Sequence, residues 1–160
     1  MGILDKAVNR DGSGGFAGGL IRLVIRFFQF VLALTVAGLY GVDLQRANYA
    51  DGKWVFAEVV AGLSAVTCLV YAGLFFVPSE KFFAWDWVLF ILWVALFGLF
   101  GNMYIGEHPT PKQGGVRRMK NAVWVDLTNM LLWLLTAVWA TVSFFRARGS
   151  RTLHTGRAKV

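Results

Sequence analysis

Four long apolar runs dominate this 160-residue chain. They cover residues 20–42, 54–77, 82–105 and 122–145. About 20 apolar residues are enough for a helix to cross the hydrocarbon core of a bilayer. Lipid requires backbone polar groups to be paired within the segment, whereas membrane barrel strands would alternate over roughly ten residues. The sequence therefore predicts an all-α integral membrane protein, a four-helix bundle of four transmembrane helices.

The composition favours a lipid environment over a charged partner. Hydrophobic residues make up 57% of the chain and charged residues only 16%, whereas about 25% is usual in a soluble domain. The net charge of +7 would suit an acidic partner, but 14 Phe and 7 Trp indicate lipid first. We expect no nucleic-acid partner, and these figures also argue against a disordered chain and most soluble enzymes.

Two tails flank the membrane domain of residues 20–145, and an even number of spans places both tails on one side. Residues 1–19 and 146–160, with the short second loop, carry more Lys and Arg than the other two loops, although the third loop is also basic. This bias predicts that both termini are cytoplasmic. The C-terminal tail could contact anionic lipid or only set the topology. The residues concerned are Arg146, Arg148 and Arg151.

Small and polar residues recur at intervals of three or four within each span, and such stripes allow membrane helices to approach closely. In chain order, the stripes comprise Arg22, Arg26, Gln29, Ala33, Ala37 and Tyr40; Glu58, Ala61, Ala65, Cys68 and Ala72; Ala95, Gly98 and Asn102; and Asp126, Asn129, Trp133, Thr136 and Ala140. We expect these stripes to face the interior of the bundle.

Charged residues inside a span are costly in lipid and usually indicate either pairing or function. With both tails on one side, Arg22, Arg26 and Asp86 lie near the same membrane surface. We therefore expect an interhelical ion pair between Asp86 and one of these two arginines, which would hold the first and third spans together.

Glu58, Asp126 and Asn129 form a second set, which we expect to be a polar cluster near the opposite surface. The two carboxylates could be neutralised by nearby basic residues, or the cluster could serve a small transporter or channel component. The candidate basic partners are Arg46, Arg117 and Arg118.

No catalytic pattern accompanies these residues. His108 and His154 lie on opposite sides in this topology, which excludes a haem held by paired histidines and leaves a zinc site without ligands. Cys68 is the sole cysteine and lies within a span. We expect a protein that is not an enzyme and holds no metal and no cofactor.

The pattern as a whole resembles the MARVEL-domain family of four-span membrane proteins, in particular the short fungal members of the non-classical export and eisosome-associated type. Four stretches carry the resemblance: residues 21–41 (IRLVIRFFQFVLALTVAGLYG), 85–87 (WDW), 97–104 (FGLFGNMY) and 124–132 (WVDLTNMLL). The resemblance implies a protein of the plasma membrane that organises membrane domains, contacts lipids (sterols or sphingolipids among them) or takes part in vesicle trafficking.

We therefore expect a non-enzymatic membrane organiser that acts through lipid contact and lateral self-association as a homo-oligomer, with other membrane proteins as further partners. Aromatic side chains are candidates for these contacts, with ordinary core packing as the alternative. They are Phe27, Phe28, Phe30, Phe75, Phe76, Trp93, Phe97, Phe100 and Trp139. The alternative function is the transporter or channel component with its polar site at Glu58, Asp126 and Asn129.

Overall fold

The protein is a bundle of four helices, in agreement with the predicted all-α membrane fold. A computed structural model describes residues 15–46, 51–73, 82–108, 110 and 113–154. The helices are α2 (Gly15–Arg46), α3 (Gly52–Gly73), α4 (Phe83–Tyr104) and α5 (Gly114–His154), and no strand occurs among these described residues. Each helix contains a segment long and apolar enough to cross a membrane.

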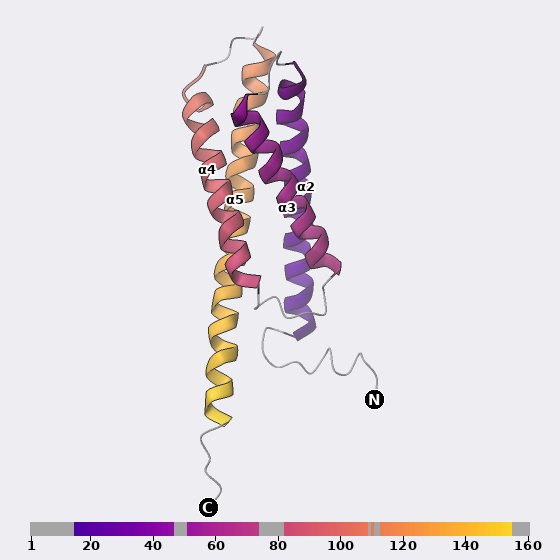
Figure 1. The fold of residues 1–160 in the computed structure, drawn as a ribbon, viewed down its shortest axis with the longest axis vertical. Coiled ribbons are helices and arrows are strands. Elements are labelled where there is room, and N and C mark those ends of the chain that lie inside the picture. The colour runs from indigo at the N-terminus through magenta and orange to yellow at the C-terminus, as the bar shows by residue number, and fades with distance from the viewer. Residues whose placement is uncertain (1–14, 47–50, 74–81, 109, 111–112, 155–160) are drawn as a thin grey trace, which may run out of the picture.

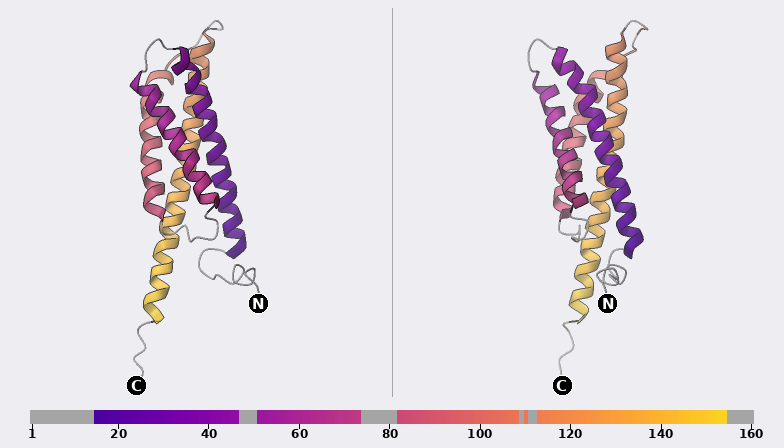
Figure 2. Two further views of the ribbon diagram at one scale, coloured as in Figure 1. Left: turned by 45° about the vertical axis from the view of Figure 1, so that its right-hand side comes forward. Right: turned by 90° about the vertical axis from the view of Figure 1, so that its right-hand side faces the viewer.

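Packing contacts run around the bundle rather than across it. The most extensive contacts join α4 to α5 and α2 to α3; those between α2 and α5 come next, followed by those between α3 and α4, and the diagonal pairs α2–α4 and α3–α5 touch least. In Figures 1 and 2, α2 begins and α5 ends at the same end of the bundle, which we call the terminal end. The final turns of α5 project beyond the other three helices at that end (Figure 1).

The helix bounds differ from the predicted spans. α2 begins at Gly15, and α5 begins at Gly114 and continues to His154. Part of the third loop and the first part of the C-terminal tail are thus helical, because no proline follows position 111 to stop the helix. α3 ends at Gly73, and positions 74–77 of its predicted span lie outside the described residues.

Three of the four predicted stripes supply the interior. Those of α2 and α5 are buried or half-buried along their described length, and that of α3 is buried from Ala61 to Cys68, although Ala72 is exposed. The stripe predicted for α4 is wrong, because Ala95, Gly98 and Asn102 all face outward. The buried residues of α4 are Asp86, Leu89, Trp93, Leu96, Phe100 and Gly101. α4 is apolar on every side, so its hydrophobic pattern does not mark an inner face.

The aromatic candidates divide between the surface and the interior. Phe27 and Phe28 are exposed, whereas Trp93 and Phe100 are completely buried, which corrects their possible role in lipid contact. The half-buried candidates are Phe30, Phe97 and Trp139. Phe75 and Phe76 lie outside the described residues.

Candidate functional site: polar nodes inside the bundle

Arg26 lies in the interior of the bundle near the terminal end, with only 5% of its surface exposed. Its Nη2 donates to Asp86 Oδ2 of α4 at 2.5 Å, and its Nη1 donates to Gln29 Oε1 at 3.1 Å. Of the two arginines predicted to pair with Asp86, it is thus Arg26 that forms the ion pair. Because the pair is buried, substitution of one partner is destabilising: it leaves an uncompensated charge in a low-dielectric interior.

Two aromatic rings hold the same guanidinium. Arg26 Cζ lies 4.5 Å from the ring centroid of Tyr71 in α3 and 4.7 Å from that of Trp133 in α5. A cation over an aromatic face is attracted by the ring quadrupole, and more strongly where water is excluded. Arg26 of α2 therefore contacts all three other helices, and we call this arrangement the Arg26 node.

Gln29 extends the Arg26 node toward α5. Its Nε2 donates to Thr136 Oγ1 at 3.4 Å, and Thr136 Oγ1 donates in turn to the backbone oxygen of Trp133 at 3.1 Å. Gln29 is completely buried. Buried polar groups of this kind require partners, so the amide fixes the rotation of α2 relative to α5.

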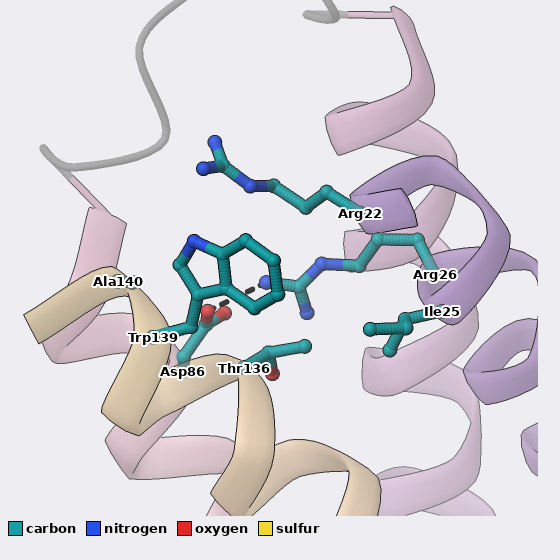
Figure 3. A pocket seen from close by; sticks show the side chains of 7 residues that line it. All are labelled: Arg22, Ile25, Arg26, Asp86, Thr136, Trp139 and Ala140. Atoms are coloured by element: carbon teal, nitrogen blue, oxygen red, sulfur yellow. Dashed lines mark hydrogen bonds and ion pairs between the residues drawn. The ribbon is translucent and has the colours of Figure 1, made fainter. Parts of the chain in front are cut away.

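A recess opens beside the Arg26 node, between α2 and α5 (Figure 3). Its interior offers about 10 Å³, which is close to the room that one water molecule needs. Arg22 reaches across it toward Trp139 in Figure 3, above the ion pair of Arg26 and Asp86. The lining residues are Arg22, Ile25, Arg26, Asp86, Thr136, Trp139 and Ala140.

Tyr40 forms the corresponding node at the opposite end of the bundle. Its hydroxyl donates to Asp126 Oδ2 of α5 at 2.6 Å. Its ring stacks on Phe100 of α4 at a centroid distance of 4.3 Å and lies 5.6 Å from the ring of Trp54 in α3. Tyr40 is fully buried. Through these contacts with α5, α4 and α3, it is a second residue of α2 that touches every other helix. We call this arrangement the Tyr40 node.

The predicted polar cluster is only partly assembled. Asp126 and Asn129 lie together on the buried face of α5, both completely buried. Glu58 is half-buried on α3, where its Oε1 fits against Gly41 of α2, at 3.0 Å from the position that a β-carbon would occupy. Within the described residues no hydrogen bond or ion pair joins Glu58 to Asp126 or Asn129.

Among the described side chains, no basic residue pairs with Glu58 or Asp126. Arg118 pairs with Asp43 of α2, a partly exposed ion pair, rather than with Glu58 or Asp126. Asp126 instead receives a neutral donor, the Tyr40 hydroxyl. Arg117 is exposed, and the side chain of Arg46 lies outside the described residues.

Several polar atoms near the middle of the bundle have no hydrogen-bond partner among the described residues. Both amide atoms of Asn129, Oδ1 of Asp126 and Nε1 of Trp133 are in this state. These residues lie on one face of α5, at positions three and four apart. Unpaired buried polar groups call for an explanation such as internal water or a functional role.

The basic residues of the C-terminal tail continue on α5. Arg146 and Arg148 are exposed, and Arg151 is on the helix but its side chain lies outside the described residues. The tail therefore begins as an extension of the fourth helix rather than as a separate segment. The contact of Arg146, Arg148 and Arg151 with anionic lipid stays a prediction.

Comparisons with protein-family models, curated proteins and solved structures find no match to this chain. The resemblance to the MARVEL-domain family therefore stays an expectation that rests on the four stretches quoted above. The function has to be argued from the placement of polar and apolar side chains in the bundle.

Proposed function

We propose that this chain is a non-enzymatic multi-pass membrane protein that organises membrane domains through lipid contact and lateral self-association. The observation that carries the proposal is the inverted distribution of side chains in the bundle. Large apolar side chains are exposed along all four helices, whereas Arg26, Asp86 and Asp126 are turned inward. Exposing an apolar surface of this extent to water is unfavourable, whereas acyl chains or another copy of the chain can cover it.

Every helix contributes to this apolar surface. Phe27 of α2 is 62% exposed, Val66 of α3 59%, Ile91 of α4 61% and Leu131 of α5 51%. Such side chains pack as well against a neighbouring protomer as against lipid, because lipid removes the hydrophobic preference for either. Lateral association then depends on how well the surfaces of two protomers fit together. A stiff bundle of fixed shape can present such a surface.

The two nodes supply that stiffness. Arg26 and Tyr40 each tie α2 to the three other helices, one near each end of the bundle. The ion pair, hydrogen bonds and ring contacts of the two nodes restrain the helices that they join, although Arg26 Nε, Asp86 Oδ1 and Asp126 Oδ1 have no partner among the described residues. This arrangement supports a role as a scaffold of fixed shape.

Energy transfer between labelled copies in lipid vesicles tests the proposal. The label is placed on a cysteine introduced into a tail of the Cys68→Ser variant, since Cys68 is the sole cysteine of the chain. We expect transfer well above that of randomly distributed copies as the protein is diluted with lipid. A protein that stays strictly monomeric and leaves lipid partitioning unchanged would contradict the proposal.

Transport of a proton or small ion is the second candidate, and the unpartnered atoms of Asp126 and Asn129 favour it. Ionisable residues inside a membrane domain often mark such pathways. Flux into protein-containing liposomes tests this function, with Asp126→Asn and Glu58→Gln as variants. Flux that depends on Asp126 would replace the scaffold by a transporter, and the absence of flux would leave the scaffold.

The orientation and location belong to the same proposal. Both termini face the cytoplasm, as the distribution of Lys and Arg favours, and the plasma membrane is the site of action, as the resemblance to the MARVEL-domain family implies. The terminal end supports this orientation, because Arg22, Arg26, Arg146 and Arg148 all lie toward it. Labelling of a cysteine introduced into either tail, in sealed cells and by an impermeant reagent, would contradict the orientation.

A further inference from the structure

We propose that the recess beside the Arg26 node binds the phosphate of an anionic phospholipid from the leaflet at the terminal end. This inference rests on the proposed function, since it names the lipid that a membrane organiser of this shape would hold. The site is distinct from the basic tail and consists of Arg22, Ile25, Arg26, Asp86, Thr136, Trp139 and Ala140.

Charge is the first argument. Two guanidinium groups and one carboxylate line the recess, so its lining carries a net positive charge inside a low-dielectric surrounding. Basic pockets between transmembrane helices on the cytoplasmic side are places where anionic headgroups bind. A zwitterionic headgroup gains less, because its own cation meets Arg22 at the mouth.

An unused donor is the second argument. Arg26 is 5% exposed and lines the recess, yet its Nε has no hydrogen-bond partner among the described residues. The Nη1 and Nη2 atoms already serve Gln29 and Asp86. A buried N–H without an acceptor is costly in a membrane, and an oxygen in the recess would satisfy it.

Size and depth are the third argument. The space of about 10 Å³ admits one oxygen atom, not a whole phosphate. We place one phosphate oxygen in the recess, where it accepts from Arg26 Nε once that buried guanidinium shifts slightly toward it, and the remaining oxygens at the mouth beside Arg22. Arg22 and Arg26 are four and eight residues after Gly18, where the span begins, which is about 6 Å and about 12 Å along the helix.

The rim suits the rest of the lipid. Trp139 is half-buried, and an indole ring at this level is typical of the membrane interface. Ile25, also half-buried, presents an aliphatic side chain on the other side of the recess (Figure 3). The glycerol backbone and the start of an acyl chain would lie between these two residues.

The test counts lipids retained by the full-length protein after release from mixed bilayers of phosphatidylcholine and phosphatidic acid, by native mass spectrometry. We expect selective retention of phosphatidic acid, and about a fivefold weaker preference for it in Arg22→Gln, the effect of one cation near the headgroup. Equal retention of the two lipids by the wild-type protein would overturn the proposal.

Two matched controls separate the recess from general attraction. Arg117→Gln removes one exposed charge at the other end of α5, and Arg146→Gln removes one at the terminal end outside the recess. Both are expected to keep the preference of the wild-type protein. If Arg146→Gln weakens it as much as Arg22→Gln, the basic tail and not the recess is the site.

A second variant guards against loss of folding in Arg22→Gln. Ala140→Val narrows the recess without changing any charge, and we expect it to reduce retention of phosphatidic acid while thermal unfolding in phosphatidylcholine stays near that of the wild type. Retention unchanged in this variant would contradict a phosphate oxygen inside the recess.

Soluble glycerol phosphate, added to the detergent-purified protein, distinguishes a lipid from a free phosphate. We expect no protection against unfolding by this probe, and protection equal to that by phosphatidic acid would overturn a lipid site. Energy transfer between copies, measured on the same samples, reports on the proposed function separately. Loss of transfer with retained lipid preference contradicts self-association and leaves the recess.

Discussion

Arg26 and Asp86 form an ion pair of 2.5 Å although their helices, α2 and α4, are not among those that pack extensively against each other. The pair spans the interior of the bundle, and both side chains are almost completely buried. The pair restrains all four helices, because the Arg26 guanidinium also contacts the rings of Tyr71 in α3 and Trp133 in α5.

Removing the acid of this pair should destabilise the bundle strongly. We expect Asp86→Asn to lower the free energy of unfolding in detergent by about 3 kcal/mol, because Arg26 keeps its charge without a counter-ion. The double variant Arg26→Met with Asp86→Leu should be less destabilised than Asp86→Asn, since no buried charge remains.

The ion pair of Arg118 and Asp43 provides the matched comparison. It is partly exposed, so we expect Asp43→Asn to cost about 1 kcal/mol or less. Equal costs for Asp86→Asn and Asp43→Asn would contradict the special role given to the buried pair.

Tyr40→Phe should destabilise the opposite end of the bundle. The variant keeps the ring that stacks on Phe100 but removes the hydroxyl donor at 2.6 Å from Asp126. We expect a loss of about 1–3 kcal/mol in the free energy of unfolding, the cost of leaving a buried acceptor unpaired. Tyr104→Phe makes the same chemical change at a half-buried ring and should have a much smaller effect.

Ser64→Ala should weaken the contact between α3 and α4, the least extensive of the four contacts between neighbouring helices. Trp93 Nε1 donates to Ser64 Oγ at 2.8 Å, and both residues are completely buried. We expect a loss of about 1 kcal/mol, in the range of hydrogen bonds between membrane helices. Thermal unfolding measures it, and Ser143→Ala, at a buried serine of α5 whose hydroxyl makes no hydrogen bond to the described residues, serves as the control.

A lysine on the outer surface should be tolerated only near a membrane boundary. Val66 lies near the middle of α3 and is 59% exposed, whereas Val55 is 40% exposed near its beginning. Val66→Lys should disfavour membrane insertion by about 3 kcal/mol, and Val55→Lys by much less because its side chain reaches the headgroups. A glycosylation reporter of insertion measures both, and equal insertion would contradict the assignment of this face to lipid.

The fold and part of the candidate site follow from the sequence for clear physical reasons. Apolar runs of sufficient length predict four membrane helices, and stripes of polar and small residues predict the inner faces of α2 and α5. The inner face of α4 could not be predicted, because Leu89 and Trp93 inside are no more apolar than Ile91 outside. Where the surroundings are also apolar, hydrophobicity cannot distinguish the interior from the exterior.

Which side chains pair with one another between helices could not be predicted from the sequence either. The sequence places Arg22 and Arg26 one helical turn apart on the same face of α2, and only the packing of α2 among the other helices shows that Arg26 is the one that pairs with Asp86. Tyr71 and Trp133 could not be identified as partners of Arg26, since a ring contact has no spacing rule between separate helices. The assignment of Tyr40 to Asp126 was missed for the same reason, although both residues lay on the predicted stripes.

The separation of Arg26 and Asp86 by 60 residues has a consequence for how the protein is made. Synthesis runs from the N-terminus, so α2 enters the bilayer with Arg26 before any part of α4 has been made. Until the third span arrives, that charge must be accommodated by snorkelling to the headgroups and by local water. The native pairing is therefore a late step of biogenesis, and a chain truncated after α3 carries an orphan cation in its first helix.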